Sequence, residues 1–106
     1  MNLSNLITSQ DFIDDEIVAQ KIATQDFAVM VSPEFVFEGQ TFRMLLDGHH
    51  SLAAAIEAGV EPDVTEATST LHDAVGLIED GKIDDFLTVT WMGADYRFAV
   101  SGKDVW

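Results

Sequence analysis

Cysteine is absent from the 106-residue sequence. A disulfide framework, a thiol nucleophile and a cysteine-ligated metal site are therefore excluded. Basic residues are also scarce, because five lysines and arginines stand against 19 aspartates and glutamates and leave a formal net charge of −14. Counterion release on a nucleic acid requires lysine and arginine side chains near the phosphates, so direct nucleic-acid binding is not expected.

Long apolar runs and a secretion-type leader are missing as well. The longest apolar stretches are far shorter than the roughly 20 residues of a membrane-spanning helix, and residues 1–12 contain no basic region followed by an apolar one. We therefore expect no membrane segment and a cytoplasmic location. A chain of 106 residues, 47% of them hydrophobic, is typical of one globular domain, which we expect to span residues 1–106.

The apolar pattern predicts short strands and helices that interleave without a regular βαβ rhythm. Extended stretches are predicted at 3–8, 27–31, 35–37 and 42–46, with a further short one within 61–68. Helices are predicted from Asp14 to Thr24, through the alanine-rich segment up to Gly59, and from Thr70 to Gly81. The alternating "FLTVTW" (86–91) and "YRFAV" (96–100) predict a terminal β-hairpin. We expect an α+β fold with a small mixed sheet and about three helices.

Polar residues gather where the strand predicted at 42–46 leads into the alanine-rich helix. The first amide groups of a helix lack intrahelical partners and carry a partial positive charge, so they attract anions. Gly48 has no side chain to obstruct a ligand that approaches the backbone, and Asp47 is suited to capping the helix or coordinating a cation. His49 and His50 follow at once, and Ser51 adds a hydroxyl donor. The segment predicts a phosphate-binding site.

The two histidines are the candidate catalytic residues, because imidazole exchanges protons near neutral pH. Adjacent positions on a helix point about 100° apart, so His49 and His50 are a poor pair for one metal ion. A zinc site would need a distant ligand such as His72, at a spacing that zinc sites do not favour. Each feature also has an ordinary explanation, since Asp-Gly before a helix is common capping and turn chemistry.

The stretch "LLDGHHSLAAAIEAG" (45–59) resembles the central motif of the ParB/sulfiredoxin-like superfamily. In that superfamily a strand ends in a glycine-containing turn and enters a helix with the pattern D-G-H-H-R. The resemblance implies a ParB/sulfiredoxin-like single domain in which Asp47, Gly48, His49 and His50 hold the phosphates of a nucleotide. Magnesium is the implied accompanying cation, with Asp47 as its candidate ligand.

One position departs from the motif. Ser51 stands where the superfamily has arginine, and serine lacks both the charge and the reach with which arginine holds a phosphate. Arg43, on the strand that leads to the motif, is the candidate replacement. The missing cysteine excludes sulfiredoxin chemistry.

Two hypotheses about function follow. In the first, the domain binds a nucleotide or another phosphate ester at the D-G-H-H segment and has weak hydrolase or phosphotransfer activity, with His49 or His50 as base or donor. In the second, the protein is a non-catalytic acidic interaction protein, such as a nucleic-acid mimic or an inhibitor of a basic nucleic-acid-binding partner from a phage or mobile element. Ser51 and the net charge favour the second, and the intact histidine pair favours the first.

Overall fold

Strand β4 (Gln40–Asp47) lies at the centre of a mixed sheet in the computed structural model, which describes residues 2–10 and 12–105. On one side of it lies β2 (Ala28–Val31), which is antiparallel, and on the other lies β1 (Leu6–Thr8), which is parallel. The outer strands are β5 (Asp63–Glu66), parallel to β2, and β6 (Arg97–Phe98), antiparallel to β1. The sheet order is β5-β2-β4-β1-β6.

A sixth strand, β3 (Phe35–Phe37), pairs with the first half of β4 as a hairpin. Its turn is made by Glu38 and Gly39, which both have positive φ, as the tightest hairpin turns require. This turn lies between the extended stretches predicted at 35–37 and 42–46, and the second strand begins two residues earlier than predicted, at Gln40. The strand predicted at 3–8 is present but shorter, because β1 begins at Leu6.

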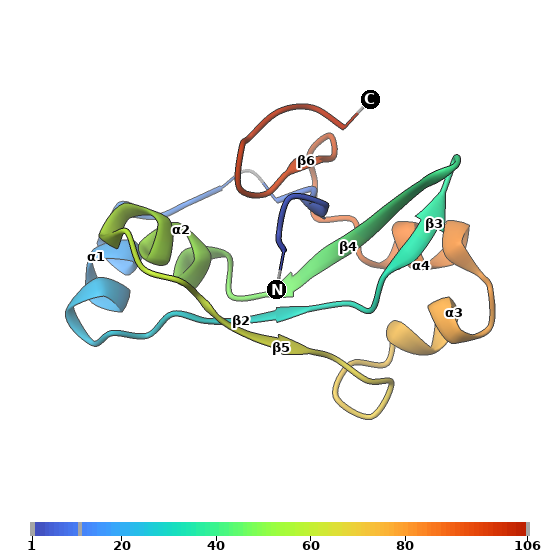
Figure 1. Ribbon diagram of the computed structural model, residues 1–106, viewed down its shortest axis with the longest axis horizontal. Helices are drawn as coiled ribbons and strands as arrows, with labels where there is room; N and C mark the ends of the chain where they lie inside the picture. The colour runs from blue at the N-terminus through green and yellow to red at the C-terminus, as the bar shows by residue number, and fades with distance from the viewer. Residues whose placement is uncertain (1, 11, 106) are drawn as a thin grey trace.

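Within residues 2–10 and 12–105, four helices accompany the sheet, where about three were predicted. Figure 1 shows α1 (Asp15–Ala23) and α2 (His49–Ala58) together at one end of the molecule, and α3 (Val75–Glu79) and α4 (Ile83–Val89) together at the other. Six strands and four helices in one mixed arrangement confirm the predicted α+β class. Among the described residues, no helix has the length and apolar character that crossing a membrane would require.

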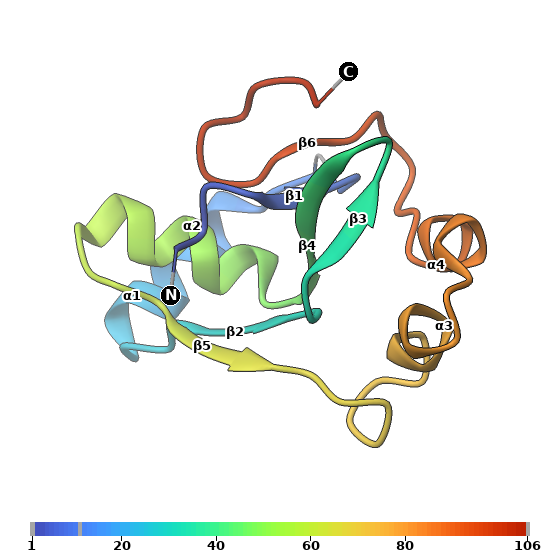
Figure 2. The same cartoon turned by 45° about the vertical axis from the view of Figure 1, so that its right-hand side comes forward.

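The alternation of β4 divides the core between the two faces of the sheet. Phe42, Met44 and Leu46 point to one face, where they join a cluster that includes Phe86 of α4. Leu45 points to the other face and packs in a second cluster with Leu52 of α2. In Figure 2, α1 and α2 lie on one side of β4, and α3 and α4 lie on the other. Both faces are therefore covered, as the apolar strands predicted.

The ends of the two longer helices agree with the sequence signals. Asp14 caps α1 by accepting a hydrogen bond from the Glu16 N–H at 2.9 Å. Gly59 ends α2 in the left-handed conformation, with φ of 70°. The helix predicted from Thr70 is wrong at its start, because α3 begins at Val75.

The predicted terminal hairpin is wrong. Residues 86–89 belong to α4, and of the segment 96–100 only Arg97 and Phe98 form a strand, which pairs with β1. The segment "FLTVTW" also fits a helix, because its buried positions, Phe86, Leu87 and Thr90, have helical spacing and lie on one face. The carboxylates Asp84 and Asp85 in the first turn of α4 favour the helix further.

Candidate functional site

The joint between β4 and α2 is built around Gly48. This residue is the N-cap of α2, with φ of 89°, and its carbonyl oxygen accepts the first helical hydrogen bond from the Leu52 N–H at 2.8 Å. The Asp47 carboxylate is exposed and accepts a hydrogen bond from the Gly48 N–H at 2.8 Å. No side chain caps the helix, so of the two roles predicted for Asp47, helix capping and cation coordination, the first is wrong. Through its bond to the Gly48 N–H, Asp47 instead stabilises the turn that precedes α2.

Gly48 is tightly packed on its own protein. A Cβ atom added there would lie 2.5 Å from the Ala28 carbonyl oxygen and 2.9 Å from the Val29 Cα atom. The space that a side chain would fill is thus occupied by the backbone of β2. We predicted that this space admits a ligand, and the structure corrects this: the glycine allows the joint to pack against β2.

His49 is half-buried and faces β1. Its Nε2 atom lies 2.8 Å from the Thr8 hydroxyl oxygen. Burial lowers the pKa of His49 to about 4; the Asp47 carboxylate opposes this effect, and the neighbouring Arg97 and His50 side chains act in the same direction as burial. The ring is therefore neutral at pH 7, which makes it a hydrogen-bonding group rather than a cation.

His50 faces a different element. Its Nε2 atom accepts a hydrogen bond from the Asp14 N–H at 3.1 Å, so the ring connects α2 to the residue that caps α1. The two imidazoles therefore diverge toward β1 and α1, as adjacent helical positions predict. They do not converge on one reacting atom.

Two further predicted site residues lie away from any ligand position at the joint. Ser51 is buried, with 2% of its surface exposed. The Arg43 guanidinium donates to the Ser32 carbonyl oxygen at 3.1 Å and to the carboxylates of Glu34, at 3.2 Å, and Glu66. Arg43 is thus neutralised by two acids, and its prediction as the replacement for the missing arginine is corrected.

A cavity of about 100 Å³ lies beside His49, between α2, β1 and β6. Its polar side chains are Thr8, His49 and Arg97. The rest of its wall is apolar and is formed by Ile13, Leu45, Leu52, Ala53, Ile56 and Ala99. The cavity therefore lies along the flank of α2, whereas the sequence predicted a site at the tip of the helix.

Arg97 is the site residue that sequence reasoning missed. It lies opposite Thr8 in the pairing of β6 with β1, and this pairing brings a residue near the end of the chain to the D-G-H-H segment. Within residues 2–10 and 12–105, the ion pairs join Lys21 to Asp26 and Arg43 to Glu34 and Glu66, and none includes Arg97. The alternation at 96–100 predicted a strand there but paired it with 86–91, whereas the strand pairs with β1.

No metal centre is evident in the part of the chain that the structure describes. Histidines and carboxylates there form no group of three that is placed to hold an ion. Asp47 offers a single exposed carboxylate, so its role as a cation ligand stays a prediction.

The lowered pKa of His49 predicts a specific pH dependence of stability. In the unfolded chain the ring has its ordinary pKa of 6.5, so between pH 4 and 6.5 the unfolded state binds more protons than the folded state. Stability should therefore rise from pH 4 to 6.5, with this contribution complete above 6.5 and lost as pH falls toward 4. We expect the contribution to be on the order of 2 kcal/mol, after allowance for partial exposure of the ring.

Urea unfolding of the wild type and of His49→Gln at several pH values between 4 and 7 measures this contribution. The difference in unfolding free energy between the two proteins should change across that range. The carboxylates are the same in both proteins, so this change reports the contribution of His49 alone. A difference that is constant with pH would contradict the assignment.

The chain was compared with known proteins at the level of families, sequences and structures. No protein-family model, no curated protein and no solved structure matches it. The ParB/sulfiredoxin-like assignment therefore stays a prediction from the motif, and the candidate site depends on its own geometry.

Proposed function

We propose that this protein binds a phosphate ester, a nucleotide among the candidates, with one phosphoryl group in the cavity between Thr8, His49 and Arg97. The observation that carries the proposal is this cavity, which places a guanidinium, a hydroxyl and a neutral imidazole around one space of about 100 Å³. Guanidinium N–H groups donate to phosphate oxygens, and the Thr8 hydroxyl does so when the His49 Nε2–H, 2.8 Å away, donates to its oxygen.

Arg97 supplies the charge for the proposed site. Arginine presents a planar fork of donors that matches the oxygens of a phosphate. Carboxylates are abundant in this chain, yet no ion pair of the described residues involves Arg97. A guanidinium without such a partner, on the wall of a cavity, is available to an external anion. Arg97 would thereby do what the motif's missing arginine does in the superfamily.

The size of the cavity restricts what it holds. Each water molecule takes about 30 Å³ of liquid, so the cavity has room for a group of a few heavy atoms. Pockets that enclose a whole small molecule measure about 300–1,000 Å³. We therefore assign to this cavity one phosphoryl group, with the remainder of the ligand outside it.

Binding without chemistry agrees best with the state of the histidines. A general base works best when its pKa lies near the working pH, and the pKa of His49 is held at about 4. The His50 Nε2 atom is already bonded to the Asp14 N–H. Hydrolase or phosphotransfer activity is thus the weaker part of the first hypothesis. Magnesium would arrive with the phosphates of a nucleotide, and Asp47 is the candidate carboxylate to meet it.

Isothermal titration calorimetry with phenyl phosphate, and with ATP, ADP and CTP in the presence of magnesium, tests the proposal. We expect at least one of these ligands to bind, and Arg97→Gln to weaken that binding at least tenfold. Lys103→Gln is the matched control, because it removes the same charge from another part of the C-terminal segment, and it should change affinity by less than about twofold. No heat with any ligand, or equal affinity of the wild type and Arg97→Gln, would overturn the proposal.

A further inference from the structure

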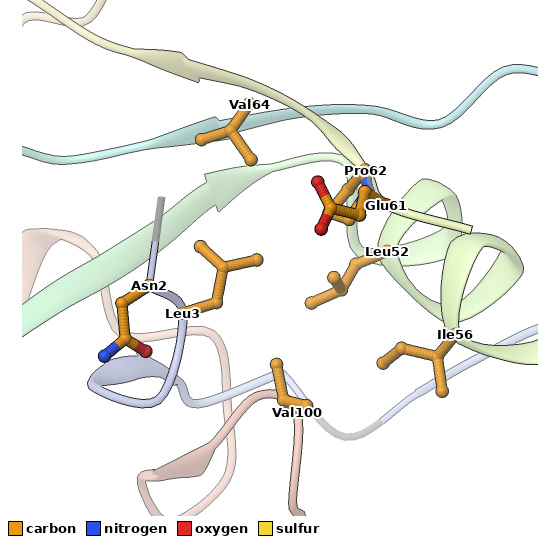
Figure 3. Close-up of a pocket in the computed structure, with 8 residues that line it drawn as sticks. All are labelled: Asn2, Leu3, Leu52, Ile56, Glu61, Pro62, Val64 and Val100. Atoms are coloured by element: carbon orange, nitrogen blue, oxygen red, sulfur yellow. The ribbon is translucent and has the colours of Figure 1, made fainter. Parts of the chain in front are cut away.

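An aliphatic groove of about 300 Å³ lies on the α2 face of the sheet, beside strand β5. Figure 3 shows five aliphatic side chains that surround its central space, from the N-terminal segment, α2, β5 and the segment after β6: Leu3, Leu52, Ile56, Val64 and Val100. Ile56 is 50% exposed and Val100 is 48% exposed, so the groove is open to solvent. None of the described residues that line it has an aromatic side chain on which a ring could stack.

Strand β5 is the outer strand of the sheet on this side. Its backbone bonds to β2 through alternate residues, since the N–H groups of Asp63 and Ala67 donate to the carbonyl oxygens of Phe27 and Val31, both in the range 2.8–2.9 Å. Backbone groups of successive strand residues point to opposite sides, so Val64 and Glu66 direct theirs outward. Val64 therefore borders the open edge with its backbone and lines the groove with its side chain.

The opposite edge of the sheet is covered. Strand β6 has two residues, and the chain after it returns to form a bridge between Arg97 and Asp104 and a hydrogen bond from the Phe98 N–H to the Lys103 carbonyl oxygen. Of the two outer strands in the sheet order, β5 is thus the one whose outer backbone groups are open to a further strand.

The free charges at the groove and at the start of β5 are negative. Glu61 lines the groove and Asp63 is exposed on the strand, whereas Glu66 at the end of the strand is paired with Arg43. None of the residues that line the groove is a lysine or an arginine. With a net charge of −14, the whole chain would also attract a cationic partner and repel a second copy of itself.

We propose that the edge of β5 and the adjacent aliphatic groove bind an extended segment of a basic protein. The segment adds to the sheet as a strand and bonds to the outward backbone groups of Val64 and Glu66. Side chains alternate along an added strand, so an aliphatic residue enters the groove while lysines or arginines beside it meet Glu61 and Asp63. This site adjoins the phosphoryl cavity, with which it shares Leu52 and Ile56, but it uses none of that cavity's polar side chains. It gives the acidic-interaction hypothesis a specific surface.

The test is a titration of ¹⁵N-labelled protein with a synthetic octapeptide in which arginine alternates with valine and leucine, followed by NMR. We expect salt-sensitive chemical-shift changes centred on residues 61–66 and on Leu52 and Ile56. The same peptide with glutamate in place of arginine should not bind. A version with N-methylated backbone amides should bind at least tenfold more weakly, because it lacks the N–H groups that would donate backbone hydrogen bonds to β5.

Protein variants locate the site. Val64→Pro removes a backbone N–H that points away from the sheet and makes no bond to β2. Val100→Asn makes the groove polar. Each variant should weaken binding of the octapeptide at least tenfold. Arg97→Gln should leave peptide binding unchanged, which separates this proposal from the phosphate site. Absent shifts, shifts centred elsewhere, retained binding by both variants, or self-association through β5 would each overturn the proposal.

Discussion

Replacing Gly48 by alanine is expected to destabilise the protein by about 3–5 kcal/mol, or to prevent folding altogether. The residue has φ of 89°, which an L-amino acid adopts at a cost of roughly 1–3 kcal/mol. The new Cβ would also lie 2.5 Å from the Ala28 carbonyl oxygen, so β2 and α2 would have to separate. Overpacking of this kind typically adds about 1–3 kcal/mol. Denaturant unfolding measures the loss.

Gly59→Ala is the matched control for this change. Gly59 also has positive φ, at 70°, but no atom lies within 4 Å of the position of its missing Cβ. The control variant therefore bears the backbone cost alone, about 1 kcal/mol. Equal losses at the two positions would show that close packing of the joint against β2 contributes nothing.

Replacing Phe86 by alanine is expected to cost about 3–5 kcal/mol. Phe86 is completely buried, and its ring meets Phe35 edge to face with centroids 5.3 Å apart. A domain of this size has a total stability of about 5–15 kcal/mol, so the variant should be close to unfolding at physiological temperature. Thermal and urea unfolding by circular dichroism measure the change.

Val89→Ala distinguishes the observed helix from the predicted hairpin. In α4, Val89 is 61% exposed, so its replacement should change stability by less than about 0.5 kcal/mol. On a strand, Val89 would share an apolar face with Leu87 and Trp91, and its loss would be costly. A larger effect for Val89→Ala than for Phe86→Ala would contradict the helix.

The fold was predictable where local chemistry decides the structure. The start of the first helix near Asp14, the turn between the strands predicted at 35–37 and 42–46, and Gly59 as a helix end all depend on a few neighbouring residues, and all three are found. The prediction for 86–91 failed because its pattern fits two periods, and the observed helix packs Phe86 against Phe35, far away in the sequence. Tertiary packing decided there.

The candidate site was predictable only in part, for the same reason. The sequence indicated the D-G-H-H joint correctly as a turn between a strand and a helix. It did not reveal that Gly48 packs on β2, that His50 bonds to Asp14, or that Arg43 is held by Glu34 and Glu66. Each of these contacts joins residues on different elements.

Arg97 shows most clearly why the sequence alone could not reveal the whole candidate site. Between it and Thr8 lie 88 residues, and their proximity follows from the pairing of β6 with β1 alone. No short motif marks such a residue. A site completed by the last strand of the sheet becomes visible once the sheet order is known.

The most direct test of the phosphoryl site is a crystal structure of the protein grown with tungstate, an oxyanion with the shape of phosphate and strong anomalous scattering. The proposal predicts an anomalous peak within hydrogen-bonding distance of the Arg97 guanidinium and the Thr8 hydroxyl, beside His49. A peak over the first amides of α2 instead, or a cavity that stays empty while tungstate occupies other positions, would contradict it.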